Sequence, residues 1–209
     1  MRDAALLASG LLNAQIGGPS VRPYQPAGLW EALATRNAVS YVQQHGDTLY
    51  RRSMYTIWKR SSPSPMMLNF DAAERHNCSV RRQKTSTPLQ ALVTLNDPQF
   101  VEAARVLATR VLEKQAANGV KQTSDSPSLA IPAVFVALIS RQPRPHELAL
   151  MTQLYKDEYQ DFSRNPKRAA ELLNVGEFKA GKQLNKSELA ALTVVASTVM
   201  NFDEFVIKR

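Results

Sequence analysis

The chain has 209 residues, of which 44% are hydrophobic and 21% are charged, and its formal net charge is +8. A chain of this size and composition buries a sizeable core, so we expect a single folded domain over residues 1–209, or two small lobes at most. No apolar run approaches the roughly 18 residues that span a bilayer, and no basic region followed by an apolar stretch marks a signal peptide. The single cysteine excludes an intrachain disulfide and the paired cysteines of a zinc or c-type haem site.

The N-terminal half mixes helical patterns with proline-rich chain. Ala5, Ala8, Leu12 and Ile16 share one stripe at helical spacing, which predicts a helix over 2–16 that ends at Gly-Gly-Pro and has Gly10 as its weak point. A short helix is expected near 29–34. The stretch LYRRSMYTIWKR favours a helix with an aromatic inner face, and a strand is the alternative. Residues 61–84 have no sustained period and predict a long irregular connection.

Clear helix starts follow in the second half of the chain. Thr87 before Pro88 and Asp97 before Pro98 each offer a side-chain oxygen to cap a helix, which predicts helices over 88–95 and 98–112. Further helices are expected to begin at Pro127, Pro145 and Pro166, and Ser187 is expected to cap a last one. In that last helix a seam through the centre of the domain is predicted, formed by Leu192, Val195, Val199, Phe202 and Val206.

No segment has the regular alternation of a half-buried strand. The sequence therefore predicts an all-α fold, an irregular helical bundle with long proline-rich and irregular connections.

The positive charge is concentrated between Tyr50 and Thr87. This basic segment contains eight basic residues and only two acidic ones, Asp71 and Glu74, so it supplies +6 of the net charge. Such an excess binds phosphate, nucleic acid, acidic polysaccharide or the acidic face of another domain. The alternative is that Lys and Arg stems cover apolar surface while their charged ends stay in water. The basic residues are Arg51, Arg52, Lys59, Arg60, Arg75, Arg81, Arg82 and Lys84.

Cys78 is the one candidate nucleophile. Arg81 and Arg82 would favour its thiolate, but a cysteine nucleophile also needs a positioned base, for which His76 is the nearest histidine. A structural thiol is the alternative. A metal pair of His76 and Cys78 lacks two further ligands at a recognisable spacing. Glycine-rich phosphate loops, G-x-S-x-G and H-E-x-x-H are absent from the sequence.

Four stretches in order carry a family resemblance: IGGPSVRPYQPAGLW, LYRRSMYTIWKR, FDAAERHNCSVRRQKTSTPLQALVTLNDPQFVEAAR and NFDEF. Together they resemble the PSD1 domain, also called DUF1553, the C-terminal module of planctomycete-type proteins that often carry an upstream c-type cytochrome domain. The resemblance implies a fragment of a larger exported protein of the periplasm or cell surface, with haem c held by a separate domain. This chain has no C-x-x-C-H, so no cofactor is expected in it. Ser86, Arg144 and the loop 118–126 depart from the family pattern.

The family has no established activity, so function is argued from the residues. We expect a non-catalytic docking or binding module whose partners are upstream domains of the same polypeptide, with an acidic protein or polysaccharide as a further partner. The alternative is part of an enzyme or carbohydrate-binding site that upstream domains complete. Anion or nucleic-acid binding through residues 50–87 is the third hypothesis, and nucleic acid is the least expected partner. The candidate binding residues are Arg51, Arg52, Trp58, Asp71, Arg81, Arg82 and Asn96.

Overall fold

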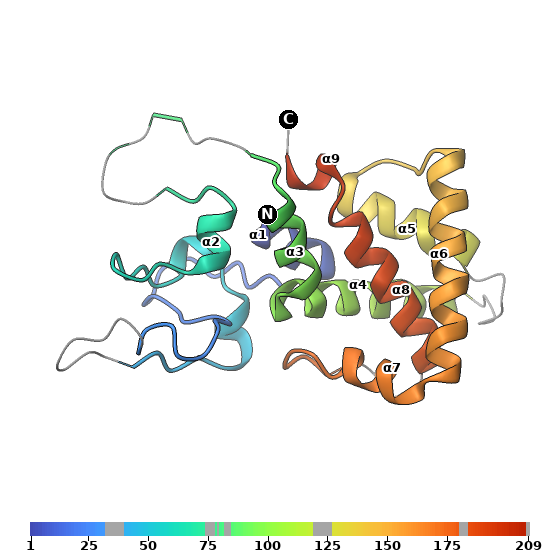
Figure 1. The fold of residues 1–209 in the computed structure, drawn as a ribbon, viewed down its shortest axis with the longest axis horizontal. Coiled ribbons are helices and arrows are strands. Elements are labelled where there is room, and N and C mark those ends of the chain that lie inside the picture. Colours follow the sequence, from blue (N-terminus) through green and yellow to red (C-terminus); the bar gives the residue numbers. More distant parts are fainter. Residues whose placement is uncertain are drawn as a thin grey trace. The chain divides into compact units, whose positions relative to one another are not determined.

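The computed structural model describes residues 1–31, 40–73, 78, 80–81, 85–118, 127–179 and 184–207. Within them the chain is helical and contains no β-sheet, so the predicted all-α class is confirmed (Figure 1). The elements are α1 (Arg2–Ser9), η1 (Gly46–Tyr50), η2 (Ser53–Tyr55), α2 (Pro65–Asn69), α3 (Pro88–Asn96), α4 (Pro98–Ala117), α5 (Pro127–Ile139), α6 (Pro145–Arg164), α7 (Pro166–Leu173), α8 (Lys186–Val199) and α9 (Asp203–Val206), where η marks a 3₁₀ turn.

Two compact units make up the chain. The first unit contains residues 1–11 and 94–209, and the second contains residues 12–93. The boundary therefore falls inside α3. Whether the two units form the single domain expected from the sequence stays a prediction. None of the helices in the described part of the chain is both long and apolar enough to cross a bilayer.

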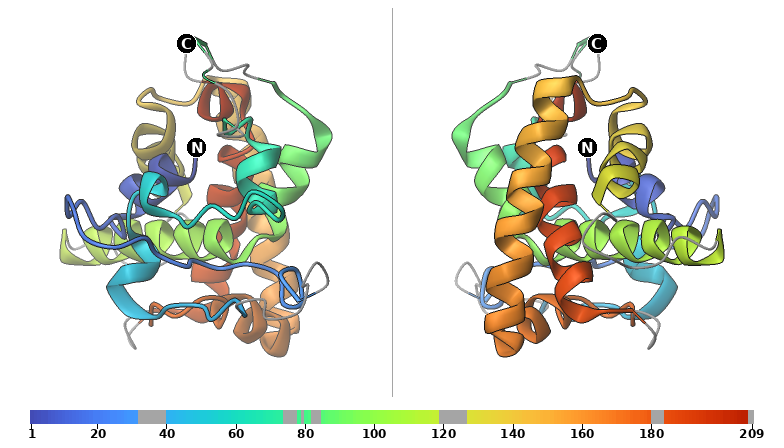
Figure 2. Two further views of the ribbon diagram at one scale, coloured as in Figure 1. Left: turned by 90° about the vertical axis from the view of Figure 1, so that its left-hand side faces the viewer. Right: turned by 90° about the vertical axis from the view of Figure 1, so that its right-hand side faces the viewer.

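Helix α8 lies at the centre of the first unit. Helices α4, α5, α6 and α7 all pack against it, and α6 runs alongside it (Figure 2). Leu189, Leu192, Val195 and Val199 are buried along its length, which confirms the predicted central seam up to Val199.

Two details of that last helix were predicted wrongly. Its cap is Asn185, whose Oδ1 accepts hydrogen bonds from the backbone N–H groups of Ser187 (3.0 Å) and Glu188 (3.4 Å), so Ser187 is not the cap. The helix also ends at Val199, and Phe202 caps the separate short helix α9. Because the turn between α8 and α9 redirects the chain, Phe202 and Val206 do not continue the seam of α8.

Helix α4 carries a buried polar pair that its apolar period does not reveal. Glu102 accepts a hydrogen bond from the Phe178 backbone N–H at 2.7 Å, and Arg105 donates to the carbonyls of Phe178 and Val175. Both side chains are fully buried. Gly176 has φ +85°, and a Cβ there would overlap the Glu102 carboxyl group. The pair thus fixes the backbone that follows α7.

The predicted helix over 2–16 ends at Ser9, which corrects its length. Gly10 adopts φ +77°, a conformation that favours glycine, and its N–H bonds to the Leu7 carbonyl to close the helix. Beyond it the chain is irregular and Ile16 is exposed.

The stretch 49–60 is neither the predicted helix nor the alternative strand. It contains the end of the 3₁₀ turn η1, the turn η2 and non-helical backbone, and it forms isolated bridges from Arg51 to Asn13 and from Thr56 to Val21. The Val21 N–H donates to the Tyr55 carbonyl (2.8 Å), and the Ile57 N–H donates to the Val21 carbonyl (2.9 Å). Bonds to a distant segment therefore replace the local helical bonds.

Two other expectations for the second unit need comment. The connection 61–84 was expected to be irregular throughout, but Pro65 starts the short helix α2. Half of the helix expected near 29–34, residues 32–34, lies outside the described residues, and its described half is a turn.

Candidate functional site

Arg51, the first of the predicted binding residues, is buried at 4% exposure. Its guanidinium donates hydrogen bonds to the carbonyls of Pro19 (3.0 Å), Gln15 (3.3 Å) and Gly17. It also stacks over the Tyr55 ring, 3.9 Å from the centroid. Arg51 therefore holds the loop 15–19 in place.

The other predicted binding residues lie in different environments. Asp71 accepts bonds from the backbone N–H and the hydroxyl of Thr85, both at 2.8 Å, and Trp58 is half-buried. Arg52 and Arg81 are exposed, as is Cys78. Asn96 ends α3 in the other unit, and Arg82 and His76 lie outside the described residues. The predicted set of binding residues therefore stays a prediction.

Helix α3 directs its polar side chains inward. Gln90 and Thr94, one helical turn apart, are exposed by only 2% and 1%. Gln90 donates from Nε2 to the Asn69 carbonyl (2.7 Å) and to Thr85 Oγ1 (3.0 Å), and it exchanges capping bonds of 3.3 Å with Thr87. The Thr94 hydroxyl donates to Asn201 Oδ1. The predicted cap at Thr87 is confirmed, and the buried side of the helix is hydrogen-bonded.

The opposite side of α3 is apolar and exposed. Leu89, Leu92 and Leu95 lie at positions i, i+3 and i+6, and they are exposed by 56%, 59% and 49%. We call these three residues the outward leucine face. A buried polar side and an exposed apolar side together invert the usual arrangement of a surface helix. The sequence signal was present, because Gln90 and Thr94 recur four residues apart on a helix without any charge.

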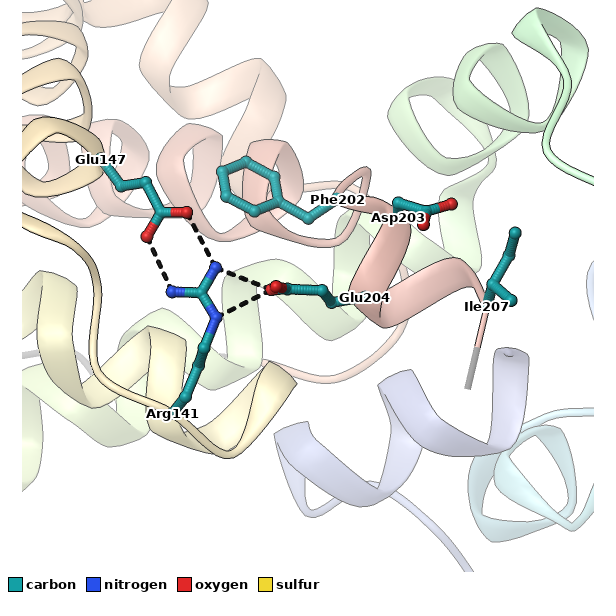
Figure 3. Close-up of a pocket in the computed structure, with 6 residues that line it drawn as sticks. All are labelled: Arg141, Glu147, Phe202, Asp203, Glu204 and Ile207. Atoms are coloured by element: carbon teal, nitrogen blue, oxygen red, sulfur yellow. Dashed lines mark hydrogen bonds and ion pairs between the residues drawn. The ribbon is translucent and has the colours of Figure 1, made fainter. Parts of the chain in front are cut away.

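A pocket of about 520 Å³ lies in the first unit, between the start of α6 and α9 (Figure 3). It is lined by Arg141, Glu147, Phe202, Asp203, Glu204 and Ile207. Arg141 comes directly after Ser140, whose φ of +58° ends α5 and turns the chain. None of these residues was predicted from the sequence to bind a ligand.

Arg141 joins the two sides of this pocket. Its terminal nitrogens contact both oxygens of Glu147 at 2.7 and 2.8 Å, and its Nε and one terminal nitrogen contact Glu204 Oε2 at 2.9 and 2.7 Å. Because of the hydrogen bonds from Arg141, the pKa of Glu147 is lowered to about 2, and the hydrogen bonds to both glutamates raise the pKa of Arg141. Glu147 and Arg141 are therefore both charged near neutral pH.

These features define a helical module that contains an inverted helix and a charged pocket. Residues 1–155 match the family model PSD1, described as a protein of unknown function (DUF1553), and the chain belongs to this family. The match contains α3 and its outward leucine face, together with Arg141 and Glu147. Comparisons with curated proteins and with solved structures gave no match.

Proposed function

We propose that the chain is a non-catalytic docking module that binds another domain of the same polypeptide through the outward leucine face. The observation that carries this proposal is the inversion of α3, in which Gln90 and Thr94 are buried while Leu89, Leu92 and Leu95 are exposed. Exposed apolar surface is costly in water unless it binds a partner. The hydrogen bonds of Gln90 and Thr94 hold the helix in this orientation.

The spacing of the leucines suits a groove-shaped partner. A helix that binds in an apolar groove uses anchors three or four residues apart, as the outward leucine face provides. Each leucine is about half exposed, so its burial contributes about 1 kcal/mol to binding. Because the helix is already folded, no ordering of the helix opposes binding.

Charge indicates a second property of the partner. The exposed Arg52 and Arg81 belong to the basic segment, so we propose that the partner carries carboxylates on its surface. Arg51 supports docking over anion binding, because its donors are directed to the carbonyls of the loop 15–19.

The family resemblance adds a setting to this proposal. We propose that the full-length protein is exported to the periplasm or cell surface and that a separate upstream domain holds haem c. A c-type haem needs two thiols and a histidine in C-x-x-C-H, whereas this chain has Cys78 alone. The residues of this chain therefore do not fit covalent haem attachment.

Binding of the chain to the separately expressed upstream domains, measured by titration calorimetry, tests the proposal. We expect Leu89→Ser, Leu92→Ser and Leu95→Ser each to weaken binding about fivefold, since 1 kcal/mol corresponds to that factor. Leu129→Ser is the matched control, because Leu129 is also 56% exposed but lies on α5. It should leave the affinity within about twofold of the wild type.

Two results would overturn the proposal. One is unchanged affinity in the triple variant of the outward leucine face. The other is turnover of an acidic or sulfated glycan by the isolated chain, which would favour the enzyme hypothesis instead.

A further inference from the structure

Helix α5 has an apolar side that faces solvent. Its 13 residues include no charged side chain, and its buried side packs against α4, α6 and α8. Leu129 and Val136 are nevertheless exposed by 56% and 45%, and Ala133 and Ala137 on the same side are exposed as well. A helix that is apolar on all sides is ordinarily buried on all sides. The described part of the chain therefore leaves one side of α5 uncovered.

The exposed residues of α5 alternate in size along the helix. Leu129, Ala133, Val136 and Ser140 follow one another at steps of four, three and four residues, so they lie on one stripe. Ser140, which is also exposed, directly follows the last residue of the helix. In chain order these side chains are large, small, large and small. We call these four residues the α5 stripe.

A second copy of α5 in the antiparallel orientation fits the α5 stripe. A two-fold axis between Ala133 and Val136 places Ala133 opposite the second copy's Val136, and Leu129 opposite the second copy's Ser140. The symmetry repeats both pairs, so every layer combines a large side chain with a small one. Because α5 has no charge, this pairing brings no like charges of the two helices together. The stripe is therefore complementary to itself in both shape and charge.

The outward leucine face of α3 lacks this property. With a two-fold axis at Leu92, Leu89 would lie opposite the second copy's Leu95, and Leu92 would lie opposite its own counterpart. Every layer would then combine two large side chains, which do not interdigitate as a large and a small one do. The outward leucine face thus suits a groove of a different partner, whereas the α5 stripe suits a second copy of the chain.

We propose that two copies of the chain pair through α5, with their α5 stripes antiparallel about a two-fold axis. The stripe extends over about 16 Å of helix. The contact is therefore smaller than the roughly 1,200 Å² that stable protein interfaces bury in total. The dimer is accordingly weak, with a dissociation constant on the order of 100 µM. This pairing does not depend on docking through the outward leucine face.

Sedimentation equilibrium of the chain alone, from about 10 µM to about 1 mM, tests the proposal. We expect a shift from monomer to dimer across this range. Ala133→Glu should weaken the dimer about tenfold or more, because it places a carboxylate from each copy in the apolar contact. Ala149→Glu, which adds the same charge at an exposed position of α6, is the matched control and should have no effect. A monomer at every concentration, or equal effects of the two variants, would overturn the proposal.

Disulfide cross-linking tests the register of the pair. In a Cys78→Ser background, chains with Ala133→Cys and chains with Val136→Cys are mixed and oxidised with oxidised glutathione. Because these two positions lie opposite each other, the mixed disulfide should form about tenfold faster than in a mixture of the Val136→Cys and Ala149→Cys chains. Equal rates in the two mixtures would contradict the proposed pairing.

Two leucine variants separate this proposal from docking. Leu129→Ser should weaken the dimer about fivefold, since each copy loses an apolar contact, and should leave docking to the upstream domains unchanged. Leu92→Ser should weaken docking and leave the dimer unchanged. Loss of the dimer in Leu92→Ser but not in Leu129→Ser would assign self-association to α3 and overturn the proposal.

Discussion

Helices α8 and α3 both carry apolar residues at a helical spacing, but they use them in opposite ways. In α8, Leu192 and Val195 are fully buried and four other helices surround them. In α3, Leu92 is 59% exposed, whereas the polar Gln90 and Thr94 are buried. The comparison teaches that the spacing of apolar residues identifies an apolar face of a helix. It does not tell whether that face is buried against other helices or exposed to solvent. The hydrogen bonds of the polar residues decide which side faces inward.

The largest expected effect comes from removing core volume in α8. Leu192→Ala should lower the free energy of unfolding by about 2 to 5 kcal/mol, because it leaves a cavity among the packed helices. Denaturant titration followed by circular dichroism measures this loss. Leu150→Ala, at an exposed position of α6, is the control and should stay within about 0.5 kcal/mol of the wild type. Similar losses in both variants would contradict the central position of α8.

A buried amide should matter more in α3 than its leucines. Gln90→Ala removes the two bonds that the buried side-chain amide donates to Asn69 and Thr85, so we expect a loss of about 1 to 3 kcal/mol. Gln160→Ala on the exposed side of α6 is the matched control. If the two glutamine variants are equally stable in denaturant, the inward side of α3 is assigned wrongly.

Thr94 offers a smaller test of the same side. Thr94→Val keeps the shape of the side chain but removes the hydroxyl that donates to Asn201, so a loss of about 1 kcal/mol is expected. The double variant with Asn201→Ala should lose little more than Asn201→Ala alone, because the bond is already absent there. Strict additivity in this thermodynamic cycle would contradict the bond.

Lowering the pH should affect the stability of the charged pocket but not that of helix α3, which has no charged residue. The pKa of Glu147 in the folded protein is about 2, below its ordinary value of 4.5, so the stability it contributes is present above pH 4.5 and is lost as the pH falls toward 2. Wild type should lose about 1 kcal/mol more than Glu147→Gln across this interval, measured by thermal unfolding. Parallel pH profiles of the two proteins would argue against the ion pair with Arg141.

Helix starts were predicted correctly where the cause is local. Thr87 and Asp97 cap α3 and α4 as expected, with Asp97 Oδ1 accepting from the Gln99 N–H at 2.9 Å. The stretch 49–60 was predicted wrongly because its backbone groups bond to residues 13–21, more than 30 positions away. A local period does not contain that information.

The candidate sites follow the same rule. Arg141 bonds to Glu204, which lies 63 positions further along the chain, so the sequence around either residue did not predict the pocket. The basic segment was visible as a count of charges, but whether Arg51 faces solvent or a loop depends on the fold. The sequence predicted the helix that carries the outward leucine face and contained its polar residues. Only the structure shows that the polar residues are buried and the leucines exposed.

The stabilities of the single variants Leu89→Ser, Leu92→Ser and Leu95→Ser test the inversion of α3 most directly. Since each side chain is about half exposed, we predict that each variant lowers the free energy of unfolding by about 1 kcal/mol in denaturant titration. A loss of several kcal/mol in each single variant, comparable to that of Leu192→Ala, would show that these leucines form part of the core and would contradict the account.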